Sequence, residues 1–206
     1  AIAKQMPGTL VNLLWTREED MQHGHYHPIT KCKLVGGLDD KGNLTGLHVR
    51  ISGQSILASV RPQWLGKDGI DMIFFQGFHA DGDHAISYSV PNLLIDHAMR
   101  NPPVPPGFWR GVNINQNAVY LECFVDELAH AAGADPLEMR LSLIEHAPSR
   151  EVLERVAELA NWGSSLPAGH ARGLAYAFSS GAATAQVIEI RRESAGIRLH
   201  RACAAV

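Results

Sequence analysis

The sequence predicts an α+β fold in which layered mixed sheets pack against about three consecutive helices. Short β-like runs come first, three segments with helical periodicity follow residue 110, and further β-like runs close the chain. Strands, then helices, then strands are typical of an α+β arrangement rather than of a regular βαβ succession. The 206 residues, 46% of them hydrophobic, suffice for one domain or two small ones.

The first hundred residues are expected to form mainly strands. Residues 31–38 and 44–51 are β-like runs on either side of the turn-rich segment DDKGN, which is typical of a hairpin. Residues 54–71 are broken by Ser, Gly and Pro and are expected to contain a loop around 62–69. Apolar patterns without helical spacing predict three further strands, at residues 10–16, 85–90 and 92–99.

The first predicted helix follows a proline-rich approach. Four prolines between residues 102 and 106 favour an extended path. Beyond it, spacings of three and four predict one buried helical stripe, formed by Ala118, Leu121, Val125, Leu128 and Ala132. Asn113 or Asn115 is the expected N-cap. Gln116 stands three residues after Asn113, as in a capping box, and Gly133 is the expected left-handed stop.

Two more helices are predicted after Gly133. Asp135 followed by Pro136 is typical of a helix start. Pro148 is expected to end this helix, and Ser149 to cap a third one that stops at Gly163. Alternating patterns then predict three strands, at residues 173–178, 184–191 and 197–204.

The predicted domain organisation has three parts. Residues 1–162 form the α+β part, residues 163–170 a linker, and residues 171–206 a β-hairpin segment that starts a next, incomplete subdomain. Both ends are expected to be cut, because the chain opens like the tail of a helix and closes on a strand without a turn.

Composition and charge exclude several classes of function. A net charge of −3 gives no electrostatic basis for binding nucleic acid or an anionic membrane. The three cysteines are far apart and lack CxxC spacing, so they indicate no disulfide framework and no zinc or iron–sulfur site, and are expected to be small buried residues. No apolar run approaches the ~18 residues of a membrane span, and no leader pattern opens the chain. The motifs GxGxxG, Walker A, GxSxG and HExxH are absent.

Arg110 and Gly111 are the main candidate site residues. They directly precede the first predicted helix, where unpaired N–H groups and the helix dipole favour anions and oxo groups. Gly111 lets another group approach the backbone closely, and Phe108 and Trp109 provide an apolar wall. The pattern predicts an oxyanion or cofactor site. The alternative is that Arg110 pairs with a neighbouring carboxylate and that the aromatic residues belong to the core.

Two histidine-containing segments offer metal sites as alternatives. His23, His25 and His27 alternate, which on a strand would direct three imidazoles to one side, where they can hold zinc or copper. The simpler interpretation is an exposed or hydrogen-bonded run, because metal sites usually need further ligands and supporting residues. The segment FHADGDH at residues 78–84 lacks the later ligands of an EF-hand and is expected to be a surface turn.

The segment FWRGVNINQNAVYLE, residues 108–122, resembles the molybdenum hydroxylases, the xanthine dehydrogenase and aldehyde oxidase family. Five residues match the family motif in register: Trp109, Arg110, Gly111, Gln116 and Glu122. WTREEDM at 15–21, YSVPNL at 88–93 and DELAHAAGADPLEMRL at 126–141 resemble segments of the same subunit in the same order. PPVPPGFWR is most similar to the isoquinoline 1-oxidoreductase β-subunit branch, which also contains membrane-associated aldehyde dehydrogenases.

The resemblance implies that the chain is an internal fragment of a molybdopterin-binding subunit, with residues 1–162 in the cofactor-binding domain. It implies a molybdenum-pterin cofactor in the complete subunit, in the cytosine dinucleotide form, and none in the fragment. Arg110, Gly111 and Gln116 are the implied cofactor-binding residues, and Trp109 and Val112 the implied substrate-binding residues. The glycine-rich loop and the catalytic glutamate are expected outside residues 1–206, so no catalytic residue and no metal ligand is assigned here.

The resemblance also implies a setting for the enzyme. Electrons are expected to pass to a [2Fe–2S] small subunit, with a cytochrome c as a candidate acceptor, in the bacterial periplasm or at the membrane periphery. Val112 stands where the xanthine enzymes have an aromatic residue, Asn113 replaces a glycine and Asn115 a proline. A smaller wall at Val112 predicts an N-heterocycle of isoquinoline type or an aldehyde as the substrate, rather than a purine.

Two other functions stay open from the sequence. One is a non-catalytic binding or assembly module, because a fragment that lacks the loop and the base should be inactive and should expose apolar surface that promotes oligomers or partner contacts. The other is a metal-binding domain that uses His23, His25 and His27.

Overall fold

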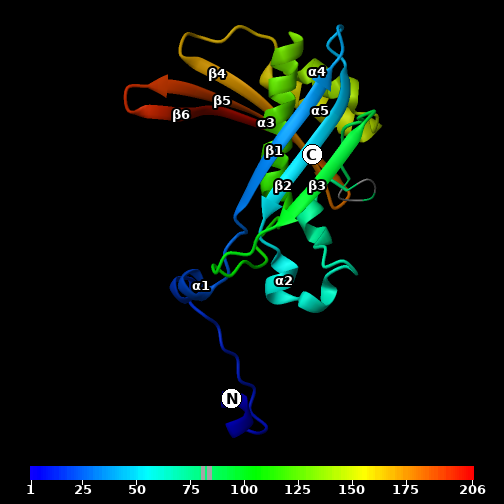
Figure 1. Ribbon diagram of the computed structural model, residues 1–206. Coiled ribbons are helices and arrows are strands. Elements are labelled where there is room, and N and C mark those ends of the chain that lie inside the picture. Colours follow the sequence, from blue (N-terminus) through cyan, green and yellow to red (C-terminus); the bar gives the residue numbers. More distant parts are fainter. Residues whose placement is uncertain (80–81, 83–84) are drawn as a thin grey trace.

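The computed structural model describes residues 1–79, 82 and 85–206. It confirms an α+β fold, with two three-stranded sheets joined by helices (Figure 1). The first sheet contains β1 (Thr30–Leu38), β2 (Leu44–Gly53) and β3 (Leu93–Met99), and the second contains β4 (His170–Ser179), β5 (Ala182–Glu193) and β6 (Gly196–Ala205). No helix in the described ranges is long and apolar enough to cross a membrane.

The first sheet is mixed, as predicted. Strands β1 and β2 form the expected antiparallel hairpin. Its turn is held by the Asp39 carboxylate, which accepts hydrogen bonds from the N–H groups of Lys41 and Asn43, and by Gly42 at φ +82°. Strand β3 runs parallel to β2, in a register that pairs Val49 with Ile95. The loop between these parallel strands carries the short helix α2 (Ile56–Val60) and the 3₁₀ turns η2 (Pro62–Trp64) and η3 (Met72–Phe75).

The three consecutive helices are confirmed as α3 (Ile114–Ala132), α4 (Pro136–Leu143) and α5 (Ala147–Ala160). Gly133 ends α3 at φ +66°, and the Asp135 side chain caps α4 by accepting from the N–H of Leu137. Pro148 was predicted to end α4, and this prediction is wrong. Pro148 lies in the first turn of α5, where its missing N–H costs nothing, and Ser149 is therefore a helix residue and not a cap.

Two predicted strands are wrong. Residues 10–16 are extended but pair with no strand of the described chain, and Leu10 is 95% exposed. Thr16 instead caps α1 (Arg17–His23) by accepting from the Glu19 N–H. This N-terminal segment, which begins with η1 (Ile2–Gln5), extends away from the sheets (Figure 1). Residues 85–90 form no strand, because Ala85 makes only an isolated bridge to His79.

One continuous core lies between the two sheets. Strands β4, β5 and β6 confirm the three strands predicted at residues 173–178, 184–191 and 197–204. They form an antiparallel sheet, and α5 packs against β5 and β6. Helix α3 contacts both β1 and β4, so its predicted apolar stripe bridges the sheets. The buried residues include Val49 and Ile51 of β2, Leu121 and Val125 of α3, and Leu174 and Val187 of the second sheet. The domain boundary at residues 163–170 stays a prediction.

One cysteine and several large apolar side chains are exposed to solvent. Cys123 is exposed and not buried, because it lies on the outer face of α3, whereas Cys32 and Cys203 are half-buried. Exposed large apolar side chains occur in the N-terminal segment and on β6: Leu10, Leu13, Leu14, Trp15, Ile197 and Leu199. They fit the expectation of exposed apolar surface, while oligomer formation stays a prediction.

Candidate functional site

The chain reverses direction at residues 109–112, directly before α3. The Val112 N–H donates to the Trp109 carbonyl oxygen over 2.7 Å, which closes a β-turn. Gly111, the third residue of the turn, has φ +84°, the value that a type II turn requires and that glycine adopts without strain. Val112 follows at φ +48°, which is uncommon for a β-branched residue. This turn, residues 109–112, is the predicted cofactor site and is therefore called the cofactor turn below. It contains a strained backbone position at Val112 next to an unstrained one at Gly111.

Three side chains hold the cofactor turn and Asn113, the residue that directly follows it. Asn115 Nδ2 donates to the Arg110 carbonyl oxygen over 2.7 Å, and Gln76 Oε1 accepts from the Asn113 N–H over 2.9 Å. His27 Nε2 lies 3.0 Å from the Val112 carbonyl oxygen. A strained residue persists only where its surroundings fix it, and these contacts supply that constraint.

Gly111 is favoured by its left-handed backbone and by the nearness of Asn115. A Cβ atom at residue 111 would lie 2.1 Å from Asn115 Oδ1, so the Asn115 side chain would have to move. The sequence predicted that a group approaches the backbone at Gly111. The structure shows that the approaching group within this chain is the Asn115 amide.

Gln116 has one buried oxygen that finds no partner among the residues that the structure describes. The Ile73 carbonyl can only accept, so the Asn113 amide must donate to it and present Oδ1 to Gln116 Nε2, 2.6 Å away. That orientation leaves Gln116 Oε1 buried and unpaired. Asn113 is the N-cap residue, but the predicted capping box is wrong, because its backbone N–H already pairs with Gln76 and its side chain caps no N–H group.

Several N–H groups at the start of α3 are free. Within the described residues, the N–H groups of Gly111, Asn115 and Gln116 donate to no acceptor. In a regular helix the Gln116 N–H would donate to the Val112 carbonyl. Here Val112 is left-handed, and its carbonyl oxygen lies 3.0 Å from His27 Nε2 instead. Together with the positive end of the α3 dipole, these groups favour an anionic or oxo group at the turn.

The predicted site residues of the turn are open to solvent. Arg110 is exposed and makes no ion pair within the part of the chain that the structure describes. Phe108 and Trp109 are about half exposed, at 49% and 52%, and Val112 is partly buried. The alternative in which Arg110 pairs with a carboxylate of this chain and the aromatics form its core is therefore contradicted for the described residues.

The structure brings the predicted residues together only in part. Trp109, Arg110, Gly111 and Val112 share the turn, while the Gln116 side chain points to Asn113. A cavity of about 370 Å³ lies elsewhere, between the 85–89 segment, α5 and β4, and is lined by side chains that include Tyr88, His146, Ser149, Tyr176 and Phe178. Its polar groups pair with each other: the Tyr176 hydroxyl donates to Ser149 Oγ over 2.7 Å, and Ser149 Oγ lies 2.7 Å from His146 Nδ1.

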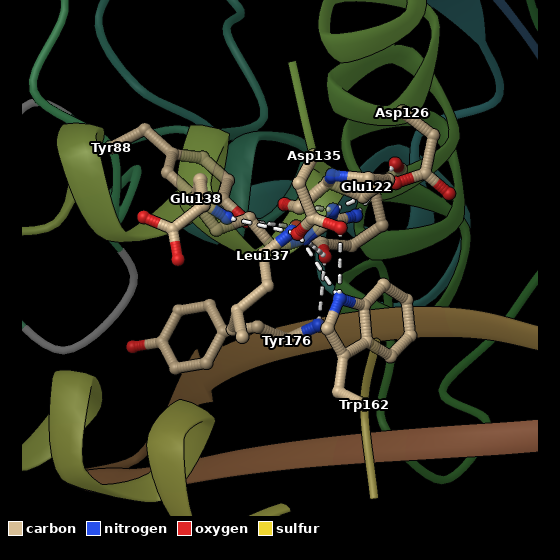
Figure 2. Close-up of polar contacts among 10 residues, drawn as sticks. Tyr88, Glu122, Asp126, Asp135, Leu137, Glu138, Trp162 and Tyr176 are labelled. Carbon is tan, nitrogen blue, oxygen red and sulfur yellow. Dashed lines mark hydrogen bonds and ion pairs between the residues drawn. The ribbon is translucent and has the colours of Figure 1, made fainter. Parts of the chain in front are cut away.

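Glu122, the last residue of the family motif, is the centre of a buried polar cluster (Figure 2). Its carboxylate accepts from the Tyr88 hydroxyl (2.6 Å), the Arg140 guanidinium (2.9 Å) and the Tyr176 N–H (2.7 Å). Arg140 also donates to Asp126 over 2.7 Å. Burial raises the pKa of the Glu122 carboxyl, while the Arg140 charge and the hydrogen bonds oppose this shift. Burial and the Glu122 charge raise the pKa of Tyr88 well above its ordinary value, so the phenol stays a donor.

Sequence reasoning missed the residues that support the site. His27 and Gln76 reach the turn from positions 85 and 37 residues away, and no local pattern marks such contacts. The burial of Glu122 could have been expected, since it is next to Leu121 on the predicted buried side of a helix. A buried carboxylate requires partners, but their identity follows only from the fold.

The histidine run does not form a strand, the condition under which the three imidazoles would point to one side. His23 ends α1, where its Nδ1 contacts Glu19, and His25 lies against Gly107. His27 turns toward Val112, so the three imidazoles diverge. No group of three or more His, Cys, Asp or Glu side chains in the described ranges is placed to hold a metal ion. Asp81, Asp83 and His84 of the FHADGDH segment lie outside the described residues.

Comparison with known proteins places these observations in a family. The molybdopterin cofactor-binding domain family matches residues 1–143. The chain is 26% identical over 193 residues to isoquinoline 1-oxidoreductase subunit beta of Brevundimonas diminuta, which covers 89% of this chain and 23% of that protein. It is 28% identical over 194 residues to a membrane-bound aldehyde dehydrogenase (pyrroloquinoline-quinone) of Gluconacetobacter polyoxogenes, covering 84% of this chain and 25% of that protein. The chain thus spans about a quarter of the length of these relatives.

Solved structures agree in fold. The aldehyde oxidoreductase of Desulfovibrio gigas matches 90% of this chain and 22% of its own, with a TM-score of 0.55 and 18% identity. The quinoline 2-oxidoreductase of Pseudomonas putida 86 matches 85% of this chain and 24% of its own, with a TM-score of 0.56 and 13% identity. Because the family match covers well over half of the residues and the fold agrees, the chain belongs to the molybdopterin cofactor-binding domain family.

Proposed function

We propose that this chain is part of the molybdopterin-binding subunit of a molybdenum hydroxylase, and that the cofactor turn with Gln116 binds the cofactor. The observation that carries the assignment is a set of donors without a partner among the residues that the structure describes: the N–H groups of Gly111, Asn115 and Gln116 and, beside them, the Arg110 guanidinium. Family membership supplies the chemical identity of the ligand.

The residues of the turn fit a molybdenum-pterin group. The cofactor carries oxo and phosphate oxygens, which are acceptors, and the turn offers donors and a positive charge. The buried Gln116 Oε1 is an acceptor without a donor, and it suits an N–H group of a pterin ring. Arg110 is the only residue of the turn with a formal charge, and its exposure leaves the guanidinium available to an anionic group.

When bound, the molybdenum centre supplies the redox chemistry that transfers an oxygen atom from water to a carbon of the substrate. The residues of this chain bind and orient. The N–H groups and Arg110 hold the anionic side of the cofactor, and Gln116 supports it. Trp109 and Val112 form the apolar border against which a flat or small substrate lies. The general base is proposed to lie in another part of the subunit.

The substrate is proposed to be an N-heterocycle or an aldehyde. The two curated relatives named above, one called an isoquinoline oxidoreductase and one an aldehyde dehydrogenase, support both classes. By the same resemblance, the cofactor is proposed to take the cytosine dinucleotide form. Electrons are proposed to leave through a [2Fe–2S] small subunit, with a cytochrome c as acceptor, at the periplasmic side or membrane periphery of a bacterium.

Metal analysis of Arg110→Ala in the complete subunit tests the proposal. The variant should retain less molybdenum and pterin per protein than the wild type, by about tenfold if one charge-assisted contact is lost. Arg100→Ala is the matched control, since Arg100 is also exposed and lies before the proline-rich approach. Wild-type molybdenum content together with wild-type turnover in Arg110→Ala would remove the site assignment.

A further inference from the structure

His27 is the one residue of the histidine run that contacts the cofactor turn. Its Nε2 lies 3.0 Å from the Val112 carbonyl oxygen, and its Nδ1 lies 3.3 Å from the Pro28 carbonyl oxygen. Both neighbours can only accept, so a neutral imidazole can satisfy one of them. The shorter distance assigns the ring proton to Nε2, which then donates to Val112.

The segment that carries His27 is fixed to the chain on the other side of the turn. The Tyr26 N–H donates to the Pro105 carbonyl, and the Gly107 N–H donates to the Tyr26 carbonyl, over 3.1 and 3.0 Å. His25 packs so closely on Gly107 that a Cβ there would lie 2.4 Å from the His25 Cβ. His27 is thus held in register with the turn by backbone bonds, and its position does not depend on its own contact to Val112.

The contact to Val112 decides which backbone groups of α3 are free. A valine at φ +48° is strained, and relaxation to right-handed helical geometry would extend the N-terminal end of α3 by one backbone hydrogen bond. In that geometry the Val112 carbonyl accepts from the Gln116 N–H, four residues later. The observed arrangement gives this carbonyl to His27 and leaves the Gln116 N–H unpaired.

We propose that His27 is a positioning residue of the cofactor turn. By donating to the Val112 carbonyl it holds Val112 in the left-handed conformation and keeps the Gln116 N–H open toward the turn. The identity of the ligand that uses this open end rests on the proposed function, whereas the coupling between His27 and Val112 is a property of the chain itself.

A pair of amide variants tests the coupling. In His27→Gln the side-chain amide nitrogen lies about as far from the backbone as the histidine Nε2, so it can replace the donor to Val112. In His27→Asn the amide nitrogen lies only as far out as Nδ1, so it cannot. Hydrogen exchange of the Gln116 amide and the Val112 HN–Hα coupling constant are measured by NMR on the full chain. In His27→Asn, Gln116 exchange should slow by at least about tenfold, since the amide gains an acceptor, and the coupling should move to a helical value. His27→Gln should resemble the wild type.

Val112→Gly completes a double-mutant cycle. Glycine adopts the left-handed conformation without strain, so His27→Asn in this background should change Gln116 exchange less than about twofold. Unchanged Gln116 exchange and an unchanged Val112 coupling in His27→Asn would overturn the proposal. Equal effects of His27→Asn with Val and with Gly at residue 112 would do so as well.

Molybdenum content of the complete subunit separates this inference from the proposed function. Lower content in His27→Asn than in His27→Gln supports the positioning role toward the cofactor. Equal content in the two His27 variants, with lower content in Arg110→Ala, overturns that role and leaves the proposed function standing. Wild-type content and wild-type turnover in all three variants overturn the cofactor-site assignment, and the NMR cycle then still decides whether His27 holds Val112.

Discussion

The Glu122 carboxylate and the Arg140 guanidinium form an ion pair that is almost completely buried between α3 and α4, with 2.9 Å between Oε2 and Nε. The same carboxylate binds Tyr88 from the preceding loop and the backbone of Tyr176 in β4 (Figure 2). One glutamate therefore joins four segments of the chain and fixes α3, the helix that directly follows the cofactor turn.

Removal of the Glu122 carboxylate should destabilise the fold strongly. Glu122→Ala leaves the Tyr88 hydroxyl and the Tyr176 N–H without their acceptor, and it removes the buried partner of the Arg140 charge, which keeps the more exposed Asp126. Breaking one partner of a buried pair costs about 3–5 kcal/mol in the free energy of unfolding. Chemical denaturation measures this change. Glu127→Ala, an exposed glutamate of the same helix, is the control and should change the free energy by less than about 0.5 kcal/mol. Equal stability of the two variants would contradict the assigned role.

Stability should fall below neutral pH because of His97. Its ring stacks on Phe74 with 3.7 Å between centroids, and its buried Nε2 has no partner. Burial lowers the pKa of His97, against smaller opposing effects of the Gly53 carbonyl and Asp71. The unfolded chain, with a pKa of about 6.5, binds the proton more readily, so stability is full above that pH and is lost as pH falls toward the folded pKa. Urea titrations at pH 7.5 and 5.5 should show a smaller difference in His97→Phe than in the wild type.

Loss of the Asp135 side chain should weaken the junction of α4 and α5. Asp135 Oδ1 accepts from the Leu137 N–H over 2.8 Å, and both carboxylate oxygens lie 3.0 Å from the Trp162 indole nitrogen (Figure 2). Asp135→Ala should cost about 1–2 kcal/mol, the usual effect of losing a cap. Asp135→Asn keeps an oxygen acceptor and should cost less. A thermal melt in which both variants behave alike would argue against the cap as the cause.

Thiol alkylation should distinguish Cys123 from Cys32. Burial raises the pKa of Cys32 to about 11, so only about 0.1% is thiolate at pH 8. Cys123 is exposed on α3. Iodoacetamide should therefore modify Cys123 first, by at least about tenfold in rate, as peptide mass spectrometry can quantify. In Cys123→Ser the fast phase should vanish, and a Cys32 rate equal to that of Cys123 would show that β1 is not packed as described.

Substrate preference of the complete enzyme should exclude purines. With Val112 as the border, an N-heterocycle of isoquinoline type or an aldehyde should exceed hypoxanthine and xanthine by at least about tenfold in kcat/KM. Steady-state kinetics with these four substrates give the comparison. Val112→Leu, which adds one methylene, should change the ranking little, whereas a strong wild-type preference for xanthine would reject the substrate proposal.

Patterns that depend on neighbouring residues were readable from the sequence. The stripe of α3 and its glycine stop, the β1–β2 hairpin and the Asp135 cap each arise from contacts within a few residues, so local propensity and side-chain chemistry determine them. The proposed cofactor residues Arg110 and Gly111 were likewise marked by their place before a helix start.

Interactions between distant segments were decided only by the tertiary structure. A strand needs a neighbouring strand to pair with, so the composition of residues 10–16 and 85–90 could not show that these segments form no strand. Pro148 fits both after one helix and at the start of the next, and only packing of α5 on the second sheet selects the latter. The hydrogen bond between His27 and Val112 joins residues that are 85 positions apart. Polar groups pair with whichever partners the fold brings close, so no local sequence pattern predicts this contact.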